Sequence, residues 1–168
     1  ADTITLSAQF SKGTINLGDG ADKLTLGDFV NTVSVANAET IIGGSLADTI
    51  TLTTVFADGL IDLGAGADKL TFGSFVNVAT VSNVETVVGG ANIDTITLGS
   101  ALTTGMSLDL GGGSDSLTLG NFTNTGTVTN VESLLGGSGN DTITYGSQII
   151  NGTIDLAGGN DKLTFGNF

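Results

Sequence analysis

The 168-residue chain contains no cysteine, histidine, proline, tryptophan or arginine. Without cysteine, no disulfide framework can hold the fold together. Without histidine and cysteine, the chain lacks the imidazole and thiolate ligands of the common zinc, copper and haem sites. The composition therefore excludes disulfide scaffolds and proteins built around soft metals.

Positive charge is nearly absent too. Four lysines (Lys12, Lys23, Lys69 and Lys162) stand against 17 acidic residues, and the formal net charge is −13. Such a surface repels nucleic acids and anionic membranes, and no apolar run approaches the ~20 residues of a membrane span, so we expect neither nucleic-acid binding nor membrane insertion. Self-repulsion opposes a compact state unless cations lie among the carboxylates. Disorder is the alternative, but the mean hydropathy is positive, which argues against it.

An internal repeat of 46 or 47 residues organises the chain. A first motif, Asp-Thr-Ile-Thr followed by Leu or Tyr, begins at Asp2, Asp48, Asp94 and Asp141. A second motif, Asp-(Lys/Ser)-Leu-Thr, begins at Asp22, Asp68, Asp115 and Asp161. A third motif is centred on Glu39, Glu85 and Glu132. We expect one repeat domain over residues 1–168, with units 1–46, 47–92 and 93–139 and a partial unit 140–168.

Each unit divides into five segments of eight to ten residues. Apolar and polar residues alternate within short runs such as Thr49–Leu52, Leu60–Leu63 and Lys69–Phe72. Strict alternation predicts half-buried strands rather than helices, and glycine-rich breaks such as 64–66 supply the positive φ angles of turns. The phenylalanines after the second motif are expected to plug the core at one corner; these are Phe29, Phe75, Phe122 and Phe168.

Uniform repetition of such segments predicts an all-β fold, a parallel β-solenoid in which each strand stacks on a later copy. We favour a two-sided β-roll of ~18–20 residues per coil, with a three-sided β-helix as the alternative. In a two-sided roll, five segments fill two and a half coils. Successive units should then present the same motif on opposite sides.

The glycine-rich turns carry a recognisable pattern. Residues Gly136 to Thr144 match every position of the nonapeptide G-G-x-G-x-D-x-U-x. Close variants cover 17–25, 43–51, 63–71, 89–97, 110–118 and 156–164. These windows resemble the hemolysin-type calcium-binding (RTX) repeats. The chain departs from that family in one respect, because only two of every five turns carry the motif.

The resemblance implies a parallel β-roll in which Ca²⁺ lies between stacked turns. It also implies that the motif aspartates bind the ion together with backbone carbonyls of the turn glycines. Carried over to this chain, the metal ligands are Asp2, Asp22, Asp48, Asp68, Asp94, Asp115, Asp141 and Asp161.

The residues argue for a cation site independently of the family. In a two-sided roll Asp48 and Asp68 lie one coil apart on the same side, and stacked strands are ~4.8 Å apart. Two carboxylates that close share a proton or require a cation, and Ca²⁺ accepts oxygen ligands in flexible geometry. The alternative is that the aspartates only cap turns by hydrogen bonds to the backbone.

We expect structural roles, rather than metal binding, for the other polar residues of the turns. We expect Glu39, Glu85 and Glu132 to form a solvated edge. The asparagines are expected to satisfy backbone groups of the turns; these are Asn31, Asn77, Asn124, Asn37, Asn83 and Asn130.

The expected function rests on the absence of residues that stand outside the repeat pattern. No candidate nucleophile, base or carboxylate dyad stands apart from it, so we expect no enzyme, unless the chain is the repeat portion of a larger secreted enzyme. Ice binding is a further alternative, since pairs such as Thr49 and Thr51 resemble those of some solenoid antifreezes. Against it, Lys23, Lys69, Ser116 and Lys162 replace the first Thr in neighbouring strands.

The leading expectation is a calcium-binding structural module of a secreted or cell-surface protein, such as an adhesin, a surface layer or an extracellular fibre. A stack of parallel strands also leaves unpaired backbone at both ends. We therefore expect self-association end to end.

Overall fold

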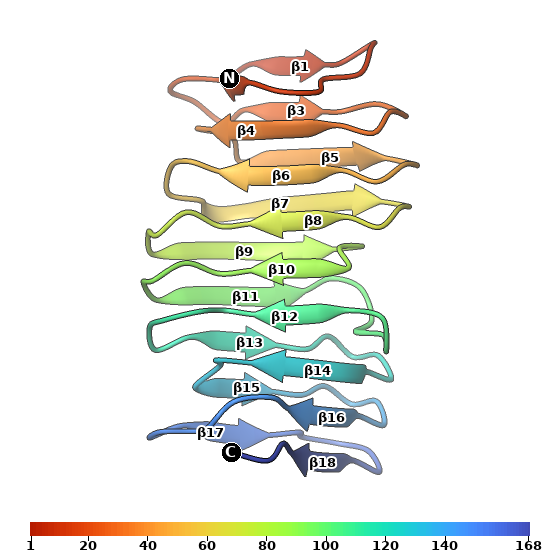
Figure 1. Cartoon of the computed structure of the whole chain (residues 1–168), viewed down its shortest axis with the longest axis vertical. Helices are drawn as coiled ribbons and strands as arrows, with labels where there is room; N and C mark the ends of the chain where they lie inside the picture. Colours follow the sequence, from red (N-terminus) through yellow and green to blue (C-terminus); the bar gives the residue numbers. More distant parts are fainter.

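The computed structural model describes all residues from Ala1 to Phe168. Eighteen short strands wind into a flattened stack, which Figure 1 shows from end to end. They form two parallel nine-stranded sheets, the odd-numbered strands in sheet A and the even-numbered strands in sheet B. The fold is an all-β parallel solenoid with two sides, as the alternation predicted, and the three-sided alternative is wrong. No helix long and apolar enough to cross a bilayer is present.

Sheet A contains β1 (Thr3–Thr5), β3 (Lys23–Thr25), β5 (Thr40–Gly44), β7 (Ala57–Gly64), β9 (Asn77–Ser82), β11 (Asp94–Leu98), β13 (Ser116–Thr118), β15 (Ser133–Leu135) and β17 (Thr153–Asp155). Sheet B contains β2 (Thr14–Asn16), β4 (Thr32–Ala36), β6 (Thr49–Leu52), β8 (Lys69–Thr71), β10 (Thr86–Val88), β12 (Ser107–Asp109), β14 (Thr125–Thr129), β16 (Thr142–Tyr145) and β18 (Lys162–Phe165).

Successive units lie on opposite sides of the roll. The first motif forms β1, β6, β11 and β16, which alternate between sheet A and sheet B. The expected offset of half a coil per unit is confirmed. It follows from the odd number of segments in a unit, because two strands complete one coil.

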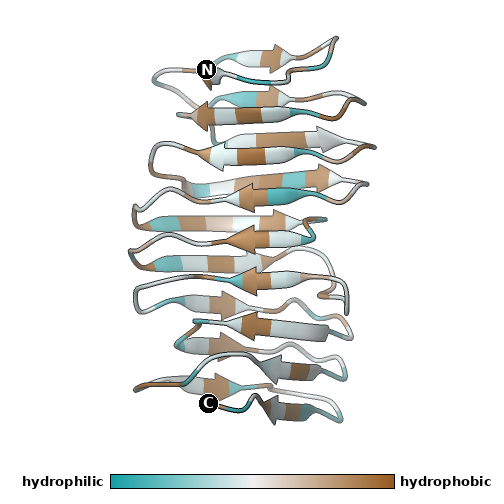
Figure 2. Cartoon of the chain, in the orientation of Figure 1, coloured by the Kyte–Doolittle hydropathy of each residue, from teal (hydrophilic) through white to brown (hydrophobic).

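A single apolar core fills the space between the sheets. Thirty-one buried residues form it, and one residue of each alternating pair contributes, such as Ile50, Ile61 and Leu70, all fully buried. Figure 2 shows this alternation as brown bands between pale ones along each strand. Burial of this apolar surface is the main force that holds the coils together, at roughly 25 cal/mol per Å².

The expected phenylalanine plugs are wrong. Phe75, Phe122 and Phe168 are 36%, 40% and 66% exposed and Phe29 is half-buried, whereas Phe56 and Leu102 are buried in the core. The reason lies two residues downstream, where a buried asparagine occupies the interior of the turn. Asn77 donates its side-chain amide to the carbonyl of Phe75, which leaves the Phe75 ring outside.

The paired glycines of the nonapeptide mark the closest approach between coils. A Cβ atom on Gly89 would collide with the backbone carbonyl of Leu110, and one on Gly90 with that of Gly73. Neither glycine has a positive φ, whereas Gly111 in the following coil has a φ of 84°. The first two glycines are therefore required for space, and only later ones for left-handed backbone.

Candidate metal centre: two ladders of buried polar side chains

Two columns of polar side chains run along the two edges of the roll, where the chain enters the strands. Along the edge before sheet B, Asn31, Asp48, Asp68 and Glu85 occupy successive coils. Along the edge before sheet A, the same order recurs as Asn77, Asp94, Asp115 and Glu132. We call each set of four a quartet. Partial quartets lie at the ends of the chain, namely Asp2, Asp22 and Glu39, and Asn124, Asp141 and Asp161.

Each side chain in a quartet binds the backbone of the coil before it. The backbone N–H of Asn31 donates to Asp48 Oδ1 at 3.0 Å, and that of Asp48 donates to Asp68 Oδ1 at 2.7 Å. The N–H of Asp68 donates in turn to Glu85 Oε2 at 2.8 Å. The result is a hydrogen-bonded ladder that fixes the register of neighbouring coils without using the strands.

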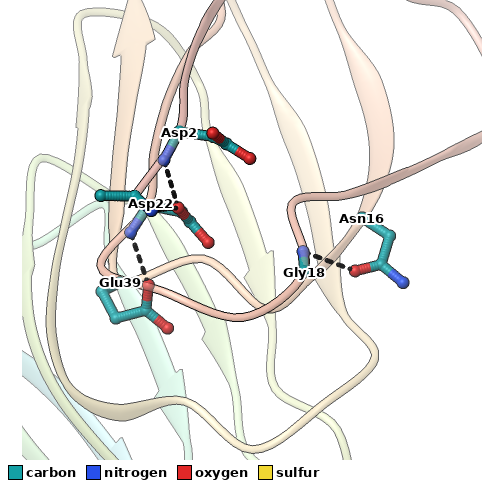
Figure 3. Close-up of polar contacts among 6 residues, drawn as sticks. Asp2, Asn16, Gly18, Asp22 and Glu39 are labelled. Carbon is teal, nitrogen blue, oxygen red and sulfur yellow. Dashed lines mark hydrogen bonds and ion pairs between the residues drawn. The ribbon is translucent and has the colours of Figure 1, made fainter.

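All four predicted aspartate pairs are brought one coil apart. In each pair the backbone N–H of the first residue donates to Oδ1 of the second; the pairs are Asp2 and Asp22, Asp48 and Asp68, Asp94 and Asp115, and Asp141 and Asp161. Figure 3 shows the first of these, with Glu39 continuing the ladder through the N–H of Asp22. Oδ1 of each acceptor thus hydrogen-bonds to the backbone, as the capping alternative expected. The N–H belongs to the neighbouring coil rather than to the acceptor's own turn.

Six of the predicted ligands are almost completely buried, at 0% or 1% exposed: Asp22, Asp48, Asp68, Asp94, Asp115 and Asp141. Asp2 and Asp161, in the first and last coils, are exposed. The expectation of a solvated edge at Glu39, Glu85 and Glu132 is wrong. These residues are half-buried, because each carboxylate accepts the backbone N–H of an aspartate at 2.7–2.8 Å.

The second oxygen of most buried aspartates has no partner. Oδ2 is buried and makes no hydrogen bond in Asp22, Asp48, Asp68, Asp115 and Asp141. Asp94 differs, since its Oδ2 accepts the N–H of Gly90 at 3.1 Å. No lysine forms an ion pair, and the one ion pair at the ladders joins the amino group of Ala1 to Asp22 Oδ1 at 3.5 Å. An unpaired buried carboxylate is costly, so these oxygens favour a proton or a cation.

Two of the buried aspartates have raised pKa values. Burial raises the pKa of Asp68 to about 6, and the charges of Glu85 and Asp48 add to the effect of burial, against a lowering by the N–H of Asp48. Burial likewise raises the pKa of Asp115 to about 6, with help from Asp94 and Glu132. In the core, burial raises the pKa of Tyr145, whose hydroxyl accepts the N–H of Val131.

The donor set suits a hard cation. It consists of carboxylate and carbonyl oxygens, the ligands that Ca²⁺ prefers, and it offers no nitrogen or sulfur. No three acidic side chains converge on one point. An ion at the ladder would therefore take at most two side chains, and backbone carbonyls or water would complete its shell. With that restriction, the unpartnered oxygens fit Ca²⁺.

One hollow of about 510 Å³ opens beside a quartet, near the end of the chain. Asp115, Glu132, Asn151 and Thr153 are among its lining residues. The corresponding aspartates Asp22 and Asp68 have no such hollow beside them.

The two groups of turn asparagines have different roles. Asn31, Asn77 and Asn124 are fully buried and donate to backbone carbonyls of their turns, as expected. Asn37, Asn83 and Asn130 take left-handed φ angles of 52–54° and donate instead to side chains, those of Asn16, Asp62 and Asp109. The backbone role was therefore wrong for the second group, because their amides reach across to the neighbouring coil.

No protein-family model, no curated protein and no solved structure matches this chain. The parallel solenoid rests on the sheets themselves, and the resemblance to RTX repeats rests on the nonapeptide motif.

Proposed function

We propose that the chain is a non-catalytic structural module of a secreted or cell-surface protein, such as an adhesin, a surface layer or an extracellular fibre, and that Ca²⁺ binds along its two polar ladders. The observation that carries the proposal is the set of five buried carboxylate oxygens without a hydrogen-bond partner. The net charge of −13 supports it, because cations among the carboxylates relieve self-repulsion.

The proposed ligands are the eight motif aspartates, Asp2, Asp22, Asp48, Asp68, Asp94, Asp115, Asp141 and Asp161. Ca²⁺ supplies positive charge to oxygens that the ladder leaves unpaired. The protein holds these oxygens in place, since Oδ1 of each acceptor is fixed by a backbone N–H of the previous coil. Binding to the folded state alone stabilises that state by mass action, about 2.7 kcal/mol per site at a hundred times Kd.

Calcium stoichiometry tests the proposed ligands. Asp141→Asn keeps an oxygen that can accept the N–H of Asn124, but it replaces the unpartnered oxygen with an amide nitrogen. We expect this variant to bind fewer Ca²⁺ ions than the wild type, as measured by equilibrium dialysis or calorimetry. The matched control is Asp109→Asn, which removes the same charge where Asp109 Oδ1 already accepts hydrogen bonds from Gly111 and Asn130.

The Asp109→Asn control should leave stoichiometry unchanged. Equal stoichiometry in Asp141→Asn and wild type, or no binding to the wild type at all, would reject the calcium part of the proposal.

We further propose that the 168-residue chain associates end to end. Sheet A runs from β1 to β17 and sheet B from β2 to β18, so each end of the stack presents one unpaired strand edge from each sheet. Apolar residues in the end coils, such as Ile4 and Leu163, pack against the core from one side only and stay partly exposed. Another copy supplies the missing side, with its β1 against β17 and its β2 against β18.

Electron microscopy should then show unbranched fibres with an axial repeat of about 43 Å, nine coils at ~4.8 Å each. Phe165→Lys is the discriminating variant, since Phe165 is 54% exposed in the last strand and a charge there disfavours stacking. The variant should stay monomeric, while Phe122→Lys, at a 40% exposed phenylalanine in the middle of the stack, should still form fibres. A monodisperse wild-type monomer at high concentration would contradict the proposal.

A further inference from the structure

The outer face of sheet B carries two nearly continuous columns of hydroxyl side chains. Strand register defines the first column, which crosses eight adjacent strands from β4 to β18. Seven of its eight residues are Thr or Ser; the column is Thr32, Thr49, Lys69, Thr86, Ser107, Thr127, Thr144 and Thr164.

The second column lies beside it, two residues further along each strand. It crosses seven strands from β2 to β14, and five of its residues carry hydroxyls; the column is Thr14, Ser34, Thr51, Thr71, Val88, Asp109 and Thr129. Together the two columns make a two-dimensional array, with hydroxyls ~4.8 Å apart between strands and ~6.7 Å apart along a strand.

The first motif alone does not produce this array. On the next strand of the sheet, a lysine pairs with the motif threonine, as Lys69 does with Thr49 and Lys162 with Thr142. In addition, the first motif alternates between the two sheets. Both features interrupt an array built from the first motif alone. The array is continuous because the other segments place Thr and Ser in the same columns, as Thr32 and Thr86 do on either side of Thr49 and Lys69.

Sheet A carries hydroxyls in register too, but its longest column is more often interrupted. That column has Thr at five of nine positions and is broken by Lys23, Leu60, Leu135 and Asp155. A shorter run of four hydroxyl residues lies beside it, namely Thr95, Ser116, Ser133 and Thr153. The outer face of sheet A includes Leu60, Val78 and Leu135, which are 41%, 37% and 44% exposed. On the strands of sheet B, the one exposed large apolar residue is Phe165 in the last strand. The two faces of the roll are therefore chemically different.

The charge distribution indicates the kind of partner. Most acids lie in the turns and ladders at the edges of the roll, and the two columns contain a single lysine and a single aspartate. A charged partner has little to bind on this face, and a protein partner finds none of the large aromatic anchors that dominate protein interfaces. Hydroxyls act as both donors and acceptors, and their regular spacing suits a neutral, periodic hydrogen-bonding lattice.

We propose that the outer face of sheet B binds ice. The threonine hydroxyls hydrogen-bond to ordered water, and their methyl groups exclude disordered water between them. The array repeats regularly in two directions, as binding to a crystal lattice requires. This activity goes beyond the structural role and does not depend on calcium ligation, except that the fold must be intact.

Thermal hysteresis and inhibition of ice recrystallisation test the proposal on the full chain. Thr144→Tyr places a bulky ring within the first column, between Thr127 and Thr164. The matched control is Thr97→Tyr, at the same position of the preceding unit but on sheet A, between Thr80 and Thr118. We expect hysteresis in the wild type, a loss of at least half in Thr144→Tyr, and no loss in Thr97→Tyr.

Thr127→Lys is a second variant, at an exposed position of the same column, and it should also lose at least half of the hysteresis. Measurements are made with calcium and with chelator, and circular dichroism confirms that each sample is folded. Failure of calcium binding with hysteresis intact would therefore reject only the calcium proposal. No hysteresis in folded wild-type protein, or equal losses in Thr144→Tyr and Thr97→Tyr, would overturn ice binding. Retention on an insoluble polysaccharide without hysteresis would overturn it as well.

Discussion

Gly89→Ala is expected to destabilise the fold by about 3 kcal/mol or more, the upper part of the range for overpacking, because the new Cβ meets rigid backbone. The atoms it would strike are the carbonyl oxygen, carbonyl carbon and Cα of Leu110 in the next coil. None of these can rotate away as a side chain does, so the two coils must separate. Chemical denaturation, followed by far-UV circular dichroism, measures the loss as a lower midpoint.

Gly105→Ala is the matched control. A Cβ on Gly105 meets nothing within 4 Å, and its φ is not positive. Alanine there should be neutral or slightly stabilising, by about 0.4–1 kcal/mol, because it restricts the unfolded chain. Equal midpoints for the two variants would contradict a packing role for Gly89.

The glycine comparison also separates packing from metal binding. If Gly89 serves only close approach, Gly89→Ala loses the same stability in calcium and in chelator. A loss confined to calcium would instead assign the glycine to the metal site. The nonapeptide pattern alone cannot make this distinction, since both roles require glycine at the same position.

The fold could be predicted because its signals are local and repeated. Alternation in runs such as Thr49–Leu52 predicts strands, and five segments per unit predict the half-coil offset that places β6 opposite β1 and β11. The pairing of Asp48 with Asp68 followed from the same count. Each of these inferences needs only the number of segments between two residues.

The ladder could not be predicted fully, because it depends on how far each side chain reaches. Glu85 has one more methylene group than aspartate, and it reaches the N–H of Asp68 from a half-buried position. Asn77 and Phe75 compete for the interior of one turn, and the hydrogen bonds of the amide decide the outcome. The hydroxyl columns were missed for a related reason, since they depend on register between segments of different sequence.

The candidate site could be predicted from the sequence only in part. Segment counting placed the carboxylates in pairs, and the resemblance to RTX repeats named calcium. The sequence did not indicate that Oδ1 of each acceptor is occupied by a backbone N–H, which leaves Oδ2 as the free oxygen. This division means that a cation and a proton compete for one oxygen per aspartate.

The competition between a proton and Ca²⁺ predicts two effects of acid. Lower pH should raise stability in chelator, and it should reduce the stabilisation that calcium adds. The pKa of Asp68 and of Asp115 is about 6 in the folded chain, against an ordinary value of 3.8. Between these values the folded state binds more protons than the unfolded state, so stability falls as pH rises. In chelator, the melting temperature should therefore increase from pH 7 to pH 5. Calcium requires the ionised carboxylates, so the stabilisation it adds should shrink over the same interval.

Thermal melts at pH 5, 6 and 7, in chelator and in millimolar calcium, measure both trends. The double variant Asp68→Asn/Asp115→Asn removes the two titrating groups and keeps oxygens that can accept the N–H of Asp48 and Asp94. In chelator it should be more stable than the wild type at pH 7 and less sensitive to pH. Asp109→Asn controls for net charge and should keep the wild-type slope. A wild-type melting temperature in chelator that falls from pH 7 to pH 5 would show that the buried carboxylates are not the groups that govern stability in this range.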